Sequence, residues 1–363
     1  MSKAYLVLEN GKVYEGRRFG AAGDVTAEAV FTTGMTGYIE TLTDPSYYGQ
    51  MVVQTFPLMG NYGIIPADFE SKRPWLSAYI VRSFCENPSN FRLDETLDAF
   101  LKAQGIVGLY DVDTRAITRQ IRRQGVMNAM ILSDLPTGQA FDALLKTLQT
   151  ANTENAVQAV TAQSASGSMD AHPVVLWDFG HKAGIARALQ ERGCAVRVMP
   201  GNSTAAEILA LQPTGVVLSN GPGDPMDNQA IIAQVRLLMQ AGLPVMGICL
   251  GHQLMALASG AKTEKLKYGH RGANQPVLNP QNLSMYITSQ NHGYTVTEDS
   301  LPQGATPLFI NANDQTIEGI AYEGTKMFSV QFHPEACGGP HDTMHLFDRF
   351  IASLKEGTPD AAQ

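Results

Sequence analysis

The sequence lacks several features that would place it in whole classes of protein. Its 363 residues include only four cysteines, widely scattered and without a CxxC pair, so neither a disulfide framework nor a cysteine-type zinc site is expected. No stretch approaches the roughly 20 apolar residues of a membrane helix, and the first residues reach charged side chains too soon for a signal peptide. We therefore expect a soluble, cytoplasmic protein that holds no metal.

Positive charge is also scarce. The chain has 26 Lys and Arg against 34 Asp and Glu, a formal net charge of −8. An acidic chain is repelled by phosphate groups, which argues against a nucleic acid or an anionic membrane as the main partner. We expect neither as a partner.

The composition and the pattern of apolar residues differ between parts of the chain. A chain of this length with 44% hydrophobic residues is long enough for two domains, each with its own core. Residues 1–150 have short apolar runs and many turn signals, which favour a β-rich mixed domain. Residues 151–172 are poor in large apolar side chains and are predicted to be the linker. A second domain is predicted over 173–356 and a tail over 357–363.

Local patterns in the first half predict individual elements. Two short apolar runs, 6–8 and 12–14, flank Asn10-Gly11, which favours a β-hairpin with a type I′ turn. Helices are predicted near 93–101, ending at Gly105, and over 114–123. The second helix would carry four arginines on one face, either as a solvated face or as a docking face for an acidic partner: Arg115, Arg119, Arg122 and Arg123.

The second half alternates strands with helices. Apolar runs predict strands over 174–177, 195–198, 215–218 and 243–246, and Thr204 with Glu207 predicts a capping box at a helix start. This alternation predicts an α/β fold, a mostly parallel sheet flanked by helices. Ligands bind such sheets at the carboxyl ends of the strands.

One cysteine lies at such a strand end. Cys249 stands in the run Gly247-Ile248-Cys249-Leu250-Gly251, between an apolar strand and a helix, and the flanking glycines permit a tight turn. At a helix N-terminus the dipole and a neighbouring imidazolium favour the thiolate. The N–H of Leu250 and the glycine loop 221–223 could stabilise an oxyanion, a contribution of ~3 kcal/mol for each donor.

A base and an orienting group follow in His333-Pro334-Glu335. Alone, a Gly-x-Cys-x-Gly run is more often a packed cysteine in a turn, and His-Pro-Glu is weaker still. The strand over 327–332 delivers His333 to a second strand end, however, and this shared location favours covalent acyl transfer. We interpret His252 and His292 as structural, and dismiss Asp178-Phe179-Gly180 as an isolated kinase-like fragment.

These motifs resemble the class I (triad) glutamine amidotransferases. The matching runs are Asn220-Gly221-Pro222-Gly223-Asp224-Pro225, Gly247 to Gln253, Gln290-Asn291-His292-Gly293, and His333-Pro334-Glu335. The runs 31–38, 43–47 and 111–115 resemble the N-terminal domain of the carbamoyl phosphate synthetase small subunit, so the resemblance covers almost the whole chain.

The resemblance implies a glutamine-hydrolysing enzyme. Cys249 would attack the side-chain amide of L-glutamine, His333 would protonate the departing ammonia and then activate water, and Glu335 would orient His333. The glutamine contacts of the family map onto Ser46, Gly221, Gly223, Leu250, Gln253, Asn291, Gly293 and Tyr294. Because Ser46 belongs to the first domain, the resemblance implies a substrate site between the two domains.

The resemblance also implies a partner. The chain has no P-loop of the GxxxxGK[ST] type, so no cofactor is expected on it, and ATP and Mg²⁺ would be bound by a large synthetase subunit that receives the ammonia and makes carbamoyl phosphate from bicarbonate. Whether the product serves arginine or pyrimidine synthesis stays open. The alternatives are a glutaminase for another synthase, such as anthranilate or aminodeoxychorismate synthase, or a scaffold that has lost catalysis.

Two features depart from the family pattern. Cys337-Gly338 stands where a serine-proline-like pair is expected, and the linker 151–172 is short. Cys337, two residues past Glu335, is predicted to be a bystander thiol near the active site. Neither departure removes a catalytic group.

Overall fold

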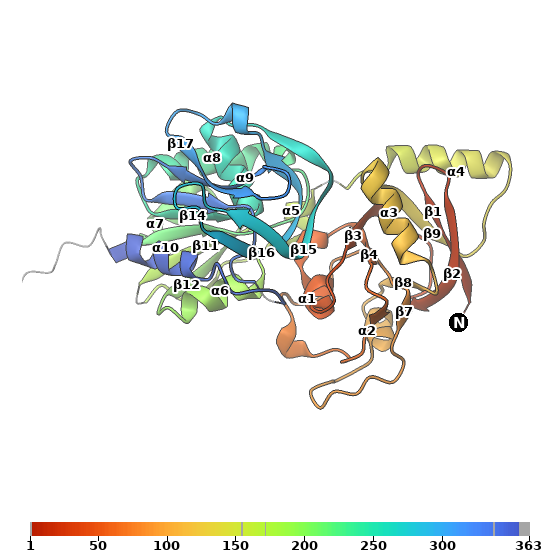
Figure 1. The fold of residues 1–363 in the computed structure, drawn as a ribbon. Coiled ribbons are helices and arrows are strands. Elements are labelled where there is room, and N and C mark those ends of the chain that lie inside the picture. Colours follow the sequence, from red (N-terminus) through yellow and green to blue (C-terminus); the bar gives the residue numbers. More distant parts are fainter. Residues whose placement is uncertain (1, 154, 171, 337, 356–363) are drawn as a thin grey trace, which may run out of the picture. The chain divides into compact units, whose positions relative to one another are not determined.

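The computed structural model describes residues 2–153, 155–170, 172–336 and 338–355, so Cys337 and the predicted tail 357–363 lie outside the described residues. The chain forms two compact units, Met1–Glu154 and Asn155–Gln363 (Figure 1). The division falls inside the segment predicted as the linker. Part of that segment is folded, because it contains α5 (Ala156–Val160) and β10 (Ser166–Gly167). The bounds of the linker stay a prediction.

The first unit is built on a closed barrel, in the strand order β1-β2-β8-β6-β4-β3-β9. Its strands are β1 (Lys3–Leu8), β2 (Val13–Gly20), β3 (Val25–Thr32), β4 (Gln50–Gln54), β6 (Ala78–Ile80), β8 (Val107–Tyr110) and β9 (Met127–Leu132), and a separate pair is formed by β5 (Leu58–Met59) and β7 (Ser83–Phe84). The helices are α1 (Tyr38–Thr43), α2 (Leu97–Ala103), α3 (Thr114–Gln124) and α4 (Gln139–Thr150), with 3-10 turns at Pro45–Tyr47 (η1) and Pro66–Asp68 (η2). The barrel closes because β9 pairs with both β1 and β3.

The predicted hairpin is present, but the predicted type I′ turn is wrong. Strands β1 and β2 pair in antiparallel register with Val7 opposite Val13. Gly11 has a φ of 82°, whereas Asn10 is not among the residues of positive φ in the described chain. A type I′ turn needs positive φ at both central residues. The N–H of Leu8 instead donates to the carbonyl of Lys12 at 2.9 Å, which leaves three residues in the loop rather than two.

The second unit contains a ten-stranded sheet within the described residues, in the order β10-β12-β11-β13-β14-β19-β18-β16-β15-β17. Its strands, besides β10, are β11 (Pro173–Asp178), β12 (Ala195–Pro200), β13 (Gly215–Leu218), β14 (Val245–Ile248), β15 (Thr263–Leu278), β16 (Met285–Val296), β17 (Ala305–Asn311), β18 (Ile317–Tyr322) and β19 (Met327–Val330). Strands β12, β11, β13, β14 and β19 run parallel. The antiparallel extension, which includes the long β15–β16 hairpin, was not predicted from the sequence.

Helices cover both faces of this sheet. They are, besides α5, α6 (Ala183–Gln190), α7 (Ala205–Ala210), α8 (Gln229–Gln240), α9 (Leu250–Ser259) and α10 (His345–Lys355), with 3-10 turns at Pro225–Asn228 (η3) and Glu298–Ser300 (η4). Alternate residues of β11 enter different cores: Val175 and Trp177 pack with α7, α8 and α9, whereas Val174 and Leu176 pack with α6 and α10 (Figure 1). Burial on both faces explains why these strands read as continuous apolar runs.

A helix must be long and apolar to cross a bilayer. Among the described residues, no helix combines the length and the apolar character that crossing a membrane would require.

Candidate active site

Cys249 lies at the junction of β14 and α9, as the sequence predicts. Its backbone has φ 54° and ψ −105°, a conformation that an L-residue adopts only at a cost of order 1–3 kcal/mol. The turn is held because the Cys249 N–H donates to the carbonyl of Val330 at 2.8 Å and the Gly251 N–H donates to the carbonyl of Ser219 at 3.0 Å. The strained turn therefore fixes the cysteine against two neighbouring strands.

The glycines around Cys249 are required by close packing. A Cβ atom at Gly251 would lie 2.4 Å from the carbonyl oxygen of Leu218, and one at Gly247 would lie 2.7 Å from the sulfur of Met255. Both distances are shorter than van der Waals contact. The Gly-x-Cys-x-Gly spacing thus follows from how tightly α9 crosses the ends of β13 and β14.

A hydrogen-bonded chain of charges follows β19. His333 Nδ1 lies 2.7 Å from Glu335 Oε1, and the same oxygen lies 3.1 Å from Lys182 Nζ. All three residues are at most 5% exposed. His333 Nε2 is buried and has no hydrogen-bond partner among the described residues, so it is the ring nitrogen that can exchange a proton with Cys249 or a substrate.

The charges of these three side chains determine which of them are protonated. Burial is the largest single influence and lowers the pKa of His333. The Glu335 carboxylate raises this pKa, Lys182 lowers it and Cys249 raises it, and the net pKa lies well above the usual range. Burial raises the pKa of Glu335, whereas Lys182 and then His333 lower it to a net value below its usual range. At neutral pH the pair is therefore an imidazolium beside a carboxylate.

Lys182 is a site residue that the sequence reasoning missed. It follows the Asp178-Phe179-Gly180 run that was dismissed as a kinase-like fragment. In the structure Asp178 accepts from the N–H groups of Gly180 and His181 at 2.8 and 2.7 Å, and the Lys182 N–H donates to Asn220 Oδ1 at 3.0 Å. The signal was its place just after a buried strand, because the carboxyl ends of parallel strands meet at one edge.

Seven of the eight predicted glutamine contacts lie in the second unit with Cys249: Gly221, Gly223, Leu250, Gln253, Asn291, Gly293 and Tyr294. Cys249 Sγ lies 3.8 Å from the carbonyl oxygen of Asn291. Gln253 Nε2 donates to the carbonyl of Tyr294 at 2.9 Å and to Gln331 Oε1 at 2.9 Å. The structure thus ties α9 to β16 directly beside the cysteine.

The glycine loop lies against the start of α9. A Cβ atom at Gly221 would lie 2.3 Å from the carbonyl oxygen of Phe179 and 2.8 Å from a methyl carbon of Leu250, so only glycine fits there. Gly223 has a φ of 90°, which also favours glycine. As the first residue of α9, Leu250 has an N–H without an intrahelical acceptor, in keeping with its predicted role as an oxyanion donor.

Ser46, the eighth predicted contact, lies in the first unit. It is buried in η1, where its N–H donates to Asp44 Oδ1 at 2.9 Å. Its contact with glutamine stays a prediction.

The two histidines interpreted as structural lie inside the second unit. His252 is fully buried, its Nδ1 lies 2.8 Å from Ser329 Oγ, and burial lowers its pKa to about 3. His292 Nδ1 lies 2.8 Å from the carbonyl of Tyr294. Neither is hydrogen-bonded to the Cys249 sulfur in the described chain.

Two family models match the chain, one in each unit. Residues 6–131 match the carbamoyl-phosphate synthase small chain, CPSase domain, and residues 175–353 match the class-I glutamine amidotransferase. A carbamoyl phosphate synthase small chain of Fusobacterium nucleatum is 48% identical over 357 residues, which cover 98% of this chain and 99% of that protein. The chain belongs to the carbamoyl phosphate synthase small-chain family.

Other members of the family are as similar. The small chain of Bacillus caldolyticus is 48% identical over 357 residues, covering 98% of this chain and 97% of that protein. The pyrimidine-specific small chain of Bacillus subtilis is 48% identical over 355 residues, covering 97% and 96%. The resemblance found in the sequence and the predicted class I amidotransferase fold are thereby confirmed, and the match of residues 6–131 argues against the anthranilate synthase alternative.

Lys182 gives a first prediction. Lys182→Met removes one partner of a buried ion pair and should lower the free energy of unfolding by about 3 kcal/mol at pH 7. The depressed pKa of Glu335 stabilises the fold fully above the ordinary carboxyl value of 4.5, and this contribution is lost progressively as the pH falls from 4.5 toward the folded-state pKa of about 2. The difference between variant and wild type should therefore narrow in acid.

Urea unfolding between pH 7 and pH 3 measures this difference. Lys267→Met, at an exposed position of β15, is the matched control and should unfold like the wild type at every pH. A Lys182→Met variant as stable as the control at pH 7 would contradict the ion pair's role.

Proposed function

We propose that this chain is the glutaminase subunit of a carbamoyl phosphate synthase and that Cys249, His333 and Glu335 carry its chemistry. The function and the enzyme class are those of the family to which the chain belongs. The observation that carries the residue assignment is the chain of contacts from Lys182 through Glu335 to His333, in the same unit as a cysteine held at a strained strand-to-helix turn.

The first half-reaction forms a thioester. The thiolate sulfur of Cys249 attacks the side-chain carbonyl carbon of L-glutamine, and the N–H of Leu250 with the loop 221–223 would stabilise the oxyanion. The imidazolium of His333 donates its Nε2 proton to the departing nitrogen, the C–N bond breaks, and ammonia leaves. Because the pKa of His333 is raised, its imidazole ring carries this proton at neutral pH.

The second half-reaction restores the enzyme. His333, now neutral, accepts a proton from a water molecule as its oxygen attacks the thioester carbon. The C–S bond then breaks, glutamate leaves, and the imidazolium forms again beside the Glu335 carboxylate, which lies 2.7 Å away. Glu335 holds the ring orientation in both steps and in turn contacts Lys182, so it has the role of an orienting group.

The ammonia is used by a partner. Membership in a small-chain family implies a large subunit, and we propose that this subunit binds ATP and Mg²⁺ and consumes the ammonia with bicarbonate. The cytoplasmic location stays a prediction. On α3 the four arginines at 115, 119, 122 and 123 are exposed, which makes this helix a candidate docking face for an acidic surface of that subunit.

A second prediction concerns coupling between the subunits. The isolated chain should hydrolyse glutamine slowly, and the large subunit should accelerate turnover by at least about tenfold, because a misplacement of ~1 Å in such a site costs on the order of 10²-fold in rate. Glutamate release with and without the large subunit, together with sizing chromatography, measures both coupling and complex formation.

The arginine face supplies the variants for this test. Arg119→Glu with Arg122→Glu should weaken the complex and the acceleration, whereas Lys146→Glu at an exposed position of α4 is the matched control. Equal turnover with and without the large subunit, and no complex on the column, would favour a stand-alone amidase. If the arginine variant still forms the complex, the docking face must lie on another surface of the chain.

A further inference from the structure

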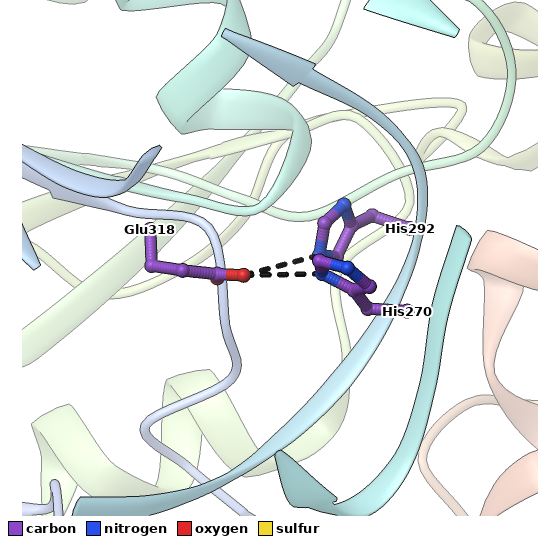
Figure 2. Close-up of side chains that lie close together, drawn as sticks. All are labelled: His270, His292 and Glu318. Carbon is purple, nitrogen blue, oxygen red and sulfur yellow. Dashed lines mark hydrogen bonds and ion pairs between the residues drawn. The ribbon is translucent and has the colours of Figure 1, made fainter. Parts of the chain in front are cut away.

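A second buried group of charged and polar side chains lies on the antiparallel extension of the sheet. His270 on β15, His292 on β16 and Glu318 on β18 point toward one another (Figure 2). His270 Nδ1 lies 3.1 Å from Glu318 Oε1, and the rings of His270 and His292 stand edge to face with centroids 4.9 Å apart. None of these residues takes part in the proposed chemistry.

The contacts of Glu318 favour an ion pair with His270. Its Oε1 accepts from His270 Nδ1 and, at 3.0 Å, from Asn311 Nδ2. Its Oε2 is buried and has no hydrogen-bond partner among the described residues. A fully buried carboxylate with one unpartnered oxygen depends on a nearby positive charge. His270 is the closer candidate, because His292 Nε2 lies 4.0 Å from Glu318 Oε1 and burial lowers the pKa of His292.

A metal ion is the competing occupant. One ligand atom each from His270, His292 and Glu318 lies within 4.8 Å of the others, a composition typical of zinc sites. In the structure, however, His270 uses both ring nitrogens, with Nε2 only 2.8 Å from Asp314 Oδ2, and Glu318 Oε1 already accepts two bonds. The ion pair satisfies these atoms without a metal, and bound zinc becomes an outcome of the test.

The ion pair is connected to the active site through β16. His270 lies opposite His292 in the strand register, and the carbonyl of Tyr294 can only accept, so His292 donates its Nδ1 proton there at 2.8 Å. The same carbonyl accepts from Gln253 on α9. Asn291, the residue before His292 on β16, presents its carbonyl oxygen to the Cys249 sulfur at 3.8 Å.

A second connection runs through β18. The carbonyl of Glu318 accepts from the N–H of Gln331 at 2.8 Å, and the His333 N–H donates to the carbonyl of Ser289 on β16 at 2.9 Å. Glu318 thus lies on the strand between β16, which contacts Cys249, and β19, after which His333 follows.

We propose that His270 and Glu318 are positioning residues whose ion pair holds the stretch 291–294 of β16 in place beside Cys249. The inference rests on the proposed function, since the stretch 291–294 is where glutamine contacts are predicted. Loss of the pair would leave Cys249, His333 and Glu335 unchanged but would let the substrate-facing strand shift.

The test uses His270→Gln, Glu318→Gln and the double variant in the assembled two-subunit enzyme. Each single variant should raise KM for glutamine at least about tenfold, with kcat within about threefold, because a displaced strand loses substrate contacts while the catalytic groups remain. The double variant should be no worse than the worse single one, because the two residues act as a unit. Ammonia-dependent synthesis should stay normal and reports an active large subunit, whereas co-elution of the two subunits in sizing chromatography reports folding and docking of the variant.

Several outcomes would overturn the proposal. An unchanged KM in a variant that keeps ammonia-dependent synthesis would remove the positioning role, as would additive effects in the double variant. Stoichiometric zinc in the purified wild type, lost in His270→Gln, would replace the ion pair with a metal site. A wild type that releases no glutamate would overturn the proposed function as well, whereas normal wild-type turnover with normal variants would overturn the positioning role alone.

Asp314→Asn keeps the proposal testable if the buried variants do not fold, because Asp314 is partly exposed. Burial lowers the pKa of His270, but Asp314 and Glu318 raise it to a net value of about 9; His292 and Arg271 are the other titratable or charged groups beside it. Loss of Asp314 should lower that pKa, so the rise of KM in alkali should begin at least about half a pH unit lower.

The matched control for this pH profile is Asp299→Asn at an exposed position, which should follow the wild type. Because every enzyme is measured with the same substrate, ionisation of glutamine itself affects all profiles equally. Superimposable profiles for wild type and Asp314→Asn would overturn the role of the charge on His270.

Discussion

Cys249→Ser is expected to abolish glutamine-dependent carbamoyl phosphate synthesis while leaving ammonia-dependent synthesis by the assembled enzyme intact. The serine hydroxyl has nearly the size of the thiol, so the strained turn at φ 54° should be kept. A hydroxyl beside an imidazolium has no base to remove its proton and is a poor nucleophile. We expect glutamate release to fall at least about 10⁴-fold.

Two assays and one control make this result specific. Carbamoyl phosphate formation is measured with glutamine and, separately, with ammonium as the nitrogen source. Cys85→Ser, at a half-buried free thiol of the first unit, should behave as the wild type in both assays. Normal glutaminase activity in Cys249→Ser would end the assignment of the nucleophile.

The second large effect is expected from the pair that follows β19. His333→Ala removes the proton donor and base, a loss of ~10²–10⁴ in rate. Glu335→Gln should cost less, because the imidazole stays in place and an amide oxygen can still accept from its Nδ1. The carboxylate raises the pKa of His333, so its loss should lower that pKa and shift the alkaline limb of the rate profile to lower pH.

The measurement is kcat/KM for glutamine between pH 6 and pH 10 for both variants. Glu323→Gln, at an exposed position between β18 and β19, is the matched control and should leave the profile unchanged. If Glu335→Gln proved the costlier change, or if its alkaline limb did not move, the roles of His333 and Glu335 would have to be reassigned.

The sequence was sufficient to predict the parallel strands of the second unit. Strands β11, β12, β13 and β14 were found because burial on both faces leaves uninterrupted apolar runs, and the capping box of Thr204 and Glu207 is present at α7. The spacing of glycines around Cys249 located the turn, since such close packing excludes any side chain.

The sequence was insufficient where partners are distant along the chain. The antiparallel strands β15 and β16 are long, irregular and partly exposed, with register shifts near Lys265 and Gly272, so their polar residues do not follow a clean period of two. The place of Lys182 just after a buried strand indicates the sheet edge where it lies, but no local pattern identifies its partner Glu335, which is 153 residues away. Closure of the barrel depends on β9 pairing with β1, which no local pattern predicts.

The position of β19 has a consequence for how the protein is synthesised. β19 lies between β14 and β18 in the middle of the sheet, although it is the last strand along the described chain. The barrel of the first unit can close once β9 has left the ribosome, but the second unit must wait until nearly the whole chain is available. The nucleophile is thus translated well before its proton donor, and a nascent or truncated chain that ends before β19 carries a thiol without a catalytic site.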